Sequence, residues 1–283
     1  MKIIILGAGF LGTKIYTYFS KYFEVLAVDK NPIDSHIINI DAFNTYQLKS
    51  FLYKHKPDII INTIALSSYY YCELNKQLCM EVNYELANNI AELSNEIKAK
   101  LIFISSSYIF NGNKGNYLET DLPDSNTSYA QAKILAEKSA LRYSSSLVLR
   151  IDSMFGYDQL SNKIRVGTNI FESKIKIAYP NLIRSPVLVD DVPVIIYKLI
   201  NLNQVGIFNI ASDLQLNWLE CIRQLAAIEH SENQIQIVSS KDWILEPPFN
   251  TSLNTKKLKS YNCIVNSFSD SLTLLKDGLK NSV

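Results

Sequence analysis

Three polar side chains near the middle of the chain have the types and the spacing needed to protonate a carbonyl oxygen. Ser106 follows an apolar run, 101–104, that is typical of a buried strand, and Tyr129 and Lys133 lie four residues apart in a helical pattern. Residues at that spacing share one face of a helix, so the phenol and the ammonium can lie together at the end of the strand. The alternative is an exposed tyrosine beside a solvated lysine, because short motifs recur by chance.

These side chains suit the reduction of a carbonyl by hydride, in which the oxygen becomes an alkoxide and must receive a proton. A free tyrosine has a pKa of about 10, which is too high for ready proton transfer near neutral pH. A cation beside the phenol favours the phenolate and lowers that pKa. We therefore expect Tyr129 to be the acid, Lys133 to lower its pKa and Ser106 to hold the oxygen by a hydrogen bond.

The start of the chain reads as a strand, a glycine-rich turn and a helix. The apolar run 2–6 is followed by Gly7, Gly9 and Gly12 in the spacing Gly-x-Gly-x-x-Gly, and a second strand ends at Asp29. In dinucleotide-binding units the first glycine allows a tight turn, the second lets the backbone approach the diphosphate, and the third lets the helix pack on the strand. The helix N-terminus then faces the phosphates, and an acid about 20 residues further on binds the adenosine ribose. The sequence therefore predicts a dinucleotide site.

The two residues at the end of the second predicted strand are compatible with either of two cofactors. Asp29 favours NAD, because a carboxylate there can bind the ribose hydroxyls. Lys30 follows it directly and could hold the extra phosphate of NADP. We therefore expect NAD or NADP.

The composition excludes several other classes of protein. The chain has 283 residues, 47% of them hydrophobic and 19% charged, with a net charge of +1, so we expect neither nucleic acid nor an anionic membrane as partner. No apolar run approaches membrane-spanning length, and the start leaves no room for a signal peptide. The histidines are isolated and the cysteines show no Cys-x-x-Cys spacing, so no metal site is predicted. A reduced, cytoplasmic setting is the simplest inference, and a homodimer is one assembly that the sequence permits.

Strands and helices alternate along the first half of the chain. This rhythm predicts an α/β fold with a doubly wound parallel sheet of the Rossmann type at 1–151 and a smaller C-terminal lobe at 152–283. About 187–210 is expected to return to the first domain, and 152–186 carries few periodic signals. The predicted strands are 2–6, 24–28, 58–61, 101–104, 147–150 and 206–210, and the predicted helices are 13–20, 46–54, 75–98, one from about 126, 192–201, 216–228 and 270–279.

Taken together, these motifs resemble the extended short-chain dehydrogenase/reductases, and within them the dTDP-4-dehydrorhamnose reductases. The segment Ser-Ser-Ser-Tyr-Ile-Phe-Asn-Gly at 105–112 is similar to their Ser-Thr-Asp-Tyr-Val-Phe-Asp-Gly, with Ser106 at the position of the catalytic threonine. The similarity continues through 149–150, 185–186, 206–210 and 250–254, and so covers nearly the whole chain. It implies that the second lobe binds a nucleotide-linked sugar.

The resemblance also implies a role for each of a set of residues. The catalytic residues would be Ser106, Tyr129 and Lys133. The cofactor would be bound by Gly7, Gly9, Phe10, Leu11, Gly12, Asp29, Lys30, Asp41, Ala42, Ile64, Ala65, Asn83, Tyr129 and Lys133, and the substrate by Ser106, Ser107, Tyr108, Arg165 and Arg184. A loop aspartate that caps a helix is the alternative for Asp41, a solvated residue for Asn83, and a surface ion pair for each arginine.

The implied activity is reduction of the C4 carbonyl of a nucleotide-linked 4-keto-6-deoxy sugar by NADH or NADPH. Ser107 replaces an Asp of the resembling reductases, and Ser153 lies near where they usually carry an aromatic residue. Because such departures cluster on the substrate side, another sugar on another nucleotide remains open. Two further alternatives are a dinucleotide-binding regulatory subunit like that of methionine adenosyltransferase, which resembles the same reductases, and a sugar-nucleotide epimerase.

Overall fold

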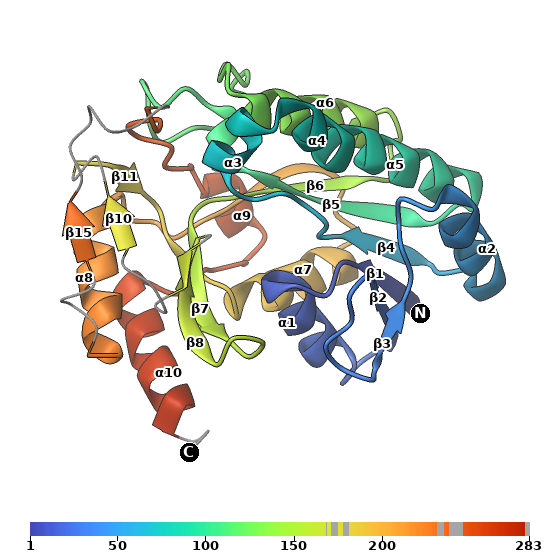
Figure 1. Ribbon diagram of the computed structural model, residues 1–283, viewed down its shortest axis with the longest axis horizontal. Helices are drawn as coiled ribbons and strands as arrows, with labels where there is room; N and C mark the ends of the chain where they lie inside the picture. Colours follow the sequence, from blue (N-terminus) through green and yellow to red (C-terminus); the bar gives the residue numbers. More distant parts are fainter. Residues whose placement is uncertain (168, 171–174, 178–180, 231–234, 238–245, 281–283) are drawn as a thin grey trace. The chain divides into compact units, whose positions relative to one another are not determined.

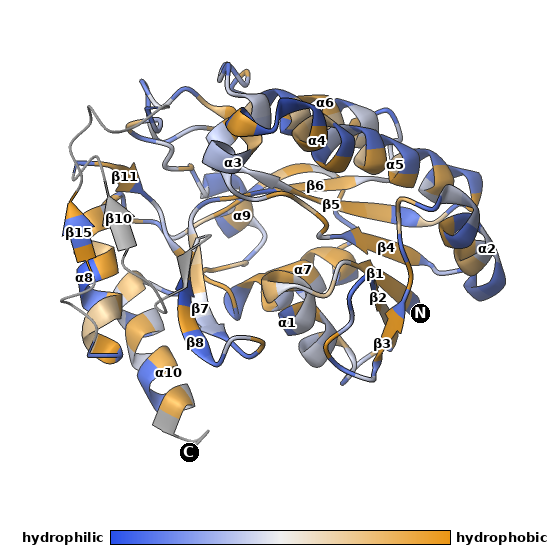
Figure 2. Cartoon of the chain, in the orientation of Figure 1, coloured by the Kyte–Doolittle hydropathy of each residue, from blue (hydrophilic) through white to orange (hydrophobic). Residues whose placement is uncertain are grey.

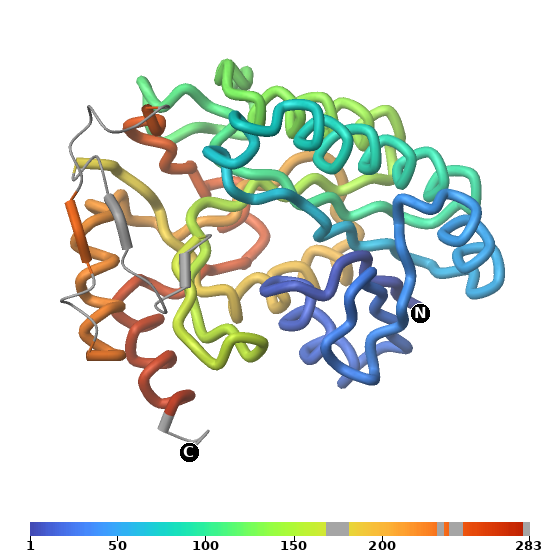
Figure 3. The backbone as a smooth tube through the Cα atoms, in the orientation of Figure 1, coloured from blue at the N-terminus to red at the C-terminus, as the bar shows by residue number. Residues whose placement is uncertain are grey.

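The chain divides into two compact units. The computed structural model describes residues 1–167, 169–170, 175–177, 181–230, 235–237 and 246–280. Unit 1 comprises 1–106, 127–150 and 193–208, and unit 2 comprises 107–126, 151–192 and 209–283. Figure 3 lets the reader follow the chain out of unit 1 after residue 150 and back into it at 193. The loop 107–126, which separates Ser106 from Tyr129 along the chain, therefore belongs to unit 2.

A seven-stranded sheet forms the centre of unit 1, as the α/β prediction requires. Its strand order is β13-β6-β5-β4-β1-β2-β3, and the pairs β1–β2, β1–β4, β2–β3 and β4–β5 are parallel. The order runs outward in both directions from β1, which makes the sheet doubly wound. The strands are β1 (Lys2–Leu6), β2 (Glu24–Asp29), β3 (Ile37–Asn39), β4 (Ile59–Asn62), β5 (Lys100–Ser106), β6 (Leu147–Ile151) and β13 (Gly206–Ile210).

Helices cover both faces of this sheet (Figure 1). Apolar side chains of α2 (Thr45–His55), α5 (Leu86–Glu96) and α6 (Ser128–Leu141) share one buried cluster with strand residues. On the other face lie α1 (Phe10–Phe19) and α7 (Asp191–Asn201). The central strands are apolar along their length, as Figure 2 shows, because a parallel sheet is buried on both sides. No helix within the described ranges has the length and apolar character needed to cross a membrane.

The helix predicted at 75–98 is confirmed as a helical stretch over 76–96, which consists of α4 (Lys76–Met80), a π-helical turn (Glu81–Glu85) and α5. A short helix that was not predicted, α3 (Tyr69–Leu74), precedes it. Asn75 separates α3 from α4 with φ −129° and ψ 59°, which lies outside the helical region.

The described part of unit 2 consists of short strands and helices, and two of the helices, α8 (Trp218–Ile228) and α10 (Phe268–Lys280), share an apolar core with the strands. A 3-10 helix (Ser107–Ile109) begins the loop 107–126. The strands of 154–188 were not predicted, because elements of two to five residues are too short to establish a periodic pattern. Helix α8 begins after Asn217, whose side chain accepts from the Glu220 N–H at 3.3 Å. The other elements are β7 (Met154–Asp158), β8 (Lys163–Val166), β9 (Asn169–Ile170), β10 (Ile175–Ile177), β11 (Ile183–Arg184), β12 (Val187–Leu188), β14 (Leu216–Asn217), β15 (Ile235–Ile237) and α9 (Lys256–Ser260).

Candidate functional site

The three predicted catalytic residues all lie in unit 1. Ser106 is the last residue of β5, and α6 carries Tyr129 in its first turn and Lys133 one turn later. Thr127 caps α6 by accepting from the Ala130 N–H at 3.2 Å. The Tyr129 and Lys133 side chains are both buried, so the alternative of an exposed tyrosine beside a solvated lysine is wrong.

The environment of Lys133 changes its acidity. Its side chain is 2% exposed, and Nζ donates a hydrogen bond to the Ile104 carbonyl oxygen at 2.6 Å. Nζ also lies 4.3 Å from the centroid of the Phe103 ring, a favourable position for a cation. Burial lowers the pKa of Lys133 to about 8, with the Glu137 carboxylate acting in the opposite direction. The ammonium is thus held at the end of β5 and is charged at neutral pH.

Two acids that the sequence analysis did not single out hold α6 in place. The Glu137 carboxylate accepts from Arg150 on β6 at 2.8 and 3.0 Å, and both side chains are buried. At the other end of the helix, Glu73 on α3 accepts from the Ser128 N–H at 2.9 Å. A carboxylate beside a helix N-terminus is favourable because of the helix dipole. The position of Tyr129 therefore depends on contacts with both α3 and the sheet.

The glycine turn has the geometry that a dinucleotide needs. Gly7 has φ +92°, and a Cβ on Gly12 would lie 2.0 Å from the Gly7 carbonyl oxygen, so both positions require glycine. A Cβ on Gly9 would meet nothing within 4 Å, which leaves open space where a diphosphate would approach the backbone. No side chain caps the helix at Gly9. Thr63 fixes the turn by donating to the Gly7 carbonyl oxygen at 2.8 Å, a role not recognised from the sequence.

Asp29 lies beside this turn, as an adenosine-binding acid should. Its carboxylate accepts from the Ala8 N–H and from the Asn31 N–H, both at 2.9 Å. Lys30 is exposed, with Nζ 6.0 Å from the centroid of the Phe43 ring. The acid is therefore fixed by two backbone donors, whereas the cation lies on the surface next to it.

The other predicted cofactor residues of this region are spread over two turns. Phe10 and Leu11 are buried in the first turn of α1. Asp41 is exposed and accepts from the Phe43 N–H at 3.0 Å, and Ala42 is buried. The cap of α2 is Asn44 rather than Asp41, since Asn44 accepts from the Gln47 N–H at 3.0 Å.

Asn83 lies on the π-helical turn and holds the loop after β4. Its side-chain oxygen accepts from the Leu66 N–H at 2.9 Å, and its nitrogen donates to the Leu66 carbonyl oxygen at 3.0 Å. Asn83 is buried, so the alternative of a solvated residue is wrong. The same loop carries Ile64, whose N–H donates to Asn62 at 3.0 Å, and the exposed Ala65.

The predicted substrate residues, Ser106 apart, lie in unit 2. The Arg184 guanidinium lies 5.2 Å from the centroid of the Tyr108 ring and donates to its hydroxyl at 3.3 Å. Arg184 is fully buried and also donates to the carbonyls of Ile183, Pro248 and Phe249. The Arg184 Nε is buried without a hydrogen-bond partner among the described residues, so a diphosphate would have to reach a fully buried guanidinium to be bound by it.

Ser107 and Arg165 have different surroundings in unit 2. Ser107 is buried and donates to Asp152 at 2.7 Å. Arg165, on β8, makes an ion pair with Asp158 at 3.4 Å and donates to the Gly167 carbonyl oxygen at 3.2 Å. Arg165 keeps part of its side chain exposed, so it is more accessible to a ligand than Arg184.

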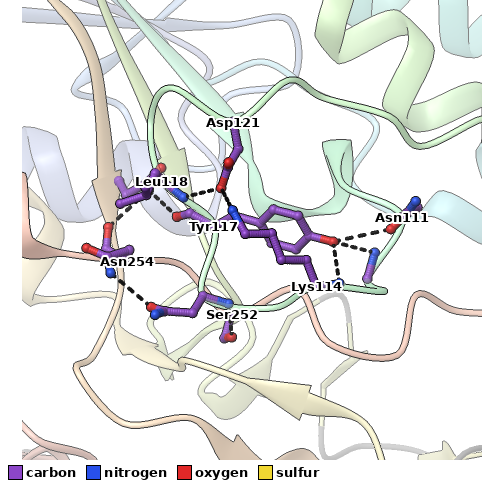
Figure 4. A network of polar contacts seen from close by, with 10 residues as sticks. Asn111, Lys114, Tyr117, Leu118, Asp121, Ser252 and Asn254 are labelled. Atoms are coloured by element: carbon purple, nitrogen blue, oxygen red, sulfur yellow. Dashed lines mark hydrogen bonds and ion pairs between the residues drawn. The ribbon is translucent and has the colours of Figure 1, made fainter.

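A polar network around Tyr117 fixes the loop 107–126 within unit 2 (Figure 4). The Tyr117 hydroxyl accepts from the Lys114 N–H at 3.1 Å, and Lys114 in turn makes an ion pair with Asp121 at 2.5 Å. The Tyr117 N–H donates to the Ser252 carbonyl oxygen at 2.9 Å. The Asn254 N–H donates to the Tyr117 carbonyl oxygen at 2.8 Å. The loop is thereby attached to the segment 250–254.

Two known proteins are similar to this chain in sequence. The spore coat polysaccharide biosynthesis protein SpsK of Bacillus subtilis is 26% identical over 258 residues, which cover 86% of this chain and 84% of SpsK. Methionine adenosyltransferase 2 subunit beta of Bos taurus is 25% identical over 158 residues, covering 55% of this chain and 47% of that subunit, about half of each.

A solved structure shares the fold across almost the whole chain. The dTDP-4-dehydrorhamnose reductase of Bacillus anthracis in complex with NADP superimposes with a TM-score of 0.82 at 21% identity, covering 97% of this chain and 98% of that one. The model of the RmlD substrate binding domain matches residues 1–279. The resemblance to the reductases is thus confirmed, and the chain belongs to the RmlD substrate-binding-domain family.

Proposed function

We propose that this protein reduces the C4 carbonyl of a nucleotide-linked 4-keto-6-deoxy sugar with NADH or NADPH. The observation that carries the proposal is the buried Lys133 ammonium, held at the end of β5 on the helix that also carries Tyr129. A buried cation one helical turn from a buried phenol serves acid–base chemistry better than it serves stability, because the burial of a charge is costly.

Three residues of the chain have distinct roles in the proposed reaction. Tyr129 gives a proton to the carbonyl oxygen, Lys133 stabilises the phenolate that remains, and Ser106 orients the oxygen by a hydrogen bond. The nicotinamide supplies hydride when it is bound. The open space at Gly9 and the carboxylate of Asp29 fit the diphosphate and the adenosine ribose.

Tyr108 and Arg165 of unit 2 are proposed to contact the sugar nucleotide. A phenol suits a hydrogen bond to a sugar hydroxyl, and a partly exposed guanidinium suits paired phosphate oxygens. Arg184 holds the Tyr108 ring, and a direct contact with the diphosphate would need its rearrangement. Rhamnose biosynthesis on dTDP is the leading pathway on family grounds.

The test is a panel of dTDP-, GDP- and UDP-linked 4-keto sugars with NADH or NADPH, followed by the loss of absorbance of the reduced cofactor. We expect turnover with one member of the panel. Tyr129→Phe should lower kcat by at least about a hundredfold, the usual contribution of general acid catalysis, and leave cofactor affinity nearly unchanged. Turnover retained by Tyr129→Phe would count against the assignment.

A second candidate is a dinucleotide-binding subunit without catalytic activity of its own. The observation in its favour is the similarity to methionine adenosyltransferase 2 subunit beta over 158 residues. Wild-type protein that binds NADPH, turns over no sugar of the panel and co-purifies with another enzyme would favour this candidate. Tightly retained NAD after purification would instead favour an epimerase.

A further inference from the structure

Asp152 is a buried carboxylate, directly after β6, that the proposed chemistry does not use. Its side chain is 3% exposed and it belongs to unit 2. Burial raises the pKa of Asp152, while the positive charge of Arg184 and several hydrogen bonds act in the opposite direction. A carboxylate that is kept in such a place at a cost in stability is expected to hold something in position.

The hydrogen bonds of Asp152 come from the next residue and from three other segments of unit 2. Oδ1 accepts from the Ser107 hydroxyl at 2.7 Å and from the Ser153 N–H at 2.8 Å, and Oδ2 accepts from the Ser185 N–H at 2.6 Å. The Thr251 hydroxyl lies 3.5 Å from the Asp152 Oδ1 and 3.3 Å from the Ser107 hydroxyl. Because two of the donors are backbone N–H groups, which only donate, both oxygens must act as acceptors.

The same segments carry the residues assigned to the sugar nucleotide. Tyr108 follows Ser107, and Arg184 precedes Ser185. The Arg184 guanidinium donates to the Tyr108 hydroxyl and to the carbonyls of 248 and 249, two residues before Thr251. The buried Asp152 carboxyl group and the buried Arg184 guanidinium therefore hold the same three segments together, at 107–108, 184–185 and 248–251. Asp152 accepts from hydroxyl and N–H groups, and Arg184 donates to oxygens.

We propose that Asp152 is the positioning residue of the substrate side, whose carboxylate sets where Tyr108 and Arg184 lie. Ser107 is its closest side-chain donor, at 2.7 Å, so the two side chains form one buried pair of a carboxylate and a hydroxyl. This inference rests on the proposed function for its substrate, whereas the pairing of 107 with 152 can be tested without it.

The first test exchanges the two groups. The free energy of unfolding is measured for wild type, Ser107→Asp, Asp152→Ser and the double variant. Ser107→Asp places two carboxylates in one buried site, and Asp152→Ser leaves buried N–H groups without their acceptor, so each single variant should lose stability. The double variant again has one carboxylate and one hydroxyl, and should be more stable than the sum of the single changes predicts. A double variant that only adds the two losses overturns the proposal.

The second test separates positioning from general stability. Asp152→Asn, which replaces one acceptor by a donor, should raise the KM for the sugar nucleotide about tenfold with the Kd for NADPH unchanged. The matched control is Asp191→Asn, because Asp191 is a half-buried acid of unit 2 that binds Asn266 at 2.7 and 3.1 Å. An equal rise of KM in both variants overturns the positioning role.

The two tests also distinguish this inference from the proposed function. If wild type reduces no sugar of the panel, the proposed function fails, yet the stability of the double variant still decides whether Asp152 and Ser107 form one exchangeable pair. If wild type turns over and the double variant shows no recovery, the function stands and the role of Asp152 is refuted.

Discussion

At the scale of single residues, Lys133 determines over what pH range the site can work. Burial lowers the pKa of its ammonium to about 8, so its charge is present below that pH and is lost as the pH rises through it. Without the charge the Tyr129 phenolate is no longer favoured, and the phenol again titrates closer to its ordinary pKa of about 10. Turnover by wild type should therefore decline above about pH 8.

The prediction is checked with two substitutions at the same position. Lys133→Met should lose activity at every pH, whereas Lys133→Arg, if it turns over at all, should not decline between pH 8 and 9.5, because a guanidinium stays charged there. A wild-type profile that remains flat from pH 7 to 10 would contradict the assignment.

The lowered pKa of Lys133 also predicts how the free energy of unfolding depends on pH. The pKa of Lys133 is lower in the folded state than in the unfolded chain, where it is about 10.4. Between these values the unfolded state binds more protons, so the free energy of unfolding should rise with pH relative to Lys133→Met, by at most about 1.4 kcal/mol per pH unit. Denaturant unfolding at pH 7.5 and 9.5 measures this difference, and the absence of any rise would show that the pKa of Lys133 is not lowered in the folded state.

At the scale of elements, two glycines of the turn between β1 and α1 have different roles. Gly12 is required by packing, and Gly9 is proposed to serve binding. A Cβ on Gly12 would lie 2.0 Å from the Gly7 carbonyl oxygen, so Gly12→Ala should push α1 from the sheet and cost several kcal/mol, about the range of overpacked sites. A Cβ on Gly9 would meet open space, and φ −79° suits alanine. Gly9→Ala should therefore fold with nearly wild-type stability and bind NADPH much more weakly.

The measurements are thermal unfolding and titration with NADPH for both variants. Each variant is the control of the other, because the two positions lie on the same turn and receive the same methyl group. Unchanged NADPH affinity in Gly9→Ala would mean that the diphosphate does not approach this backbone.

Most strands of the sheet could be predicted, because a strand that is buried on both sides is a continuous apolar run in the sequence. The run 2–6 and the run 206–210 match β1 and β13 residue for residue. The six-residue helix α3 was not predicted, because it is too short for an apolar period to be recognised, and the π-helical turn at 81–85 leaves no sign in the pattern of the sequence. The short strands of unit 2 carry no periodic pattern long enough to be recognised.

The residues of the candidate site were predicted from their types and spacing. The residues that hold them in position were not predicted. The glycine turn and Tyr129 with Lys133 follow from local spacing, because one helix or one turn positions each group. Thr63, Glu73 and Asp152 act on residues distant in the sequence, and a lone polar side chain carries no local sign of its partner.

At the scale of the whole molecule, the residues proposed for the cofactor and those proposed for the sugar belong to different compact units, with Ser106 as the exception. Binding of NADPH should therefore slow amide hydrogen exchange in unit 1, chiefly at 7–13 and 62–66, because ligand-bound loops open less often. The segments 107–110 and 183–188 of unit 2 should respond to the sugar nucleotide. Exchange measured by mass spectrometry with NADPH alone, and then with dTDP or UDP added, separates the two responses. Protection by NADPH confined to unit 2 would refute the placement of the cofactor on the glycine turn, and with it the assignment of Tyr129 and Lys133 to the chemistry.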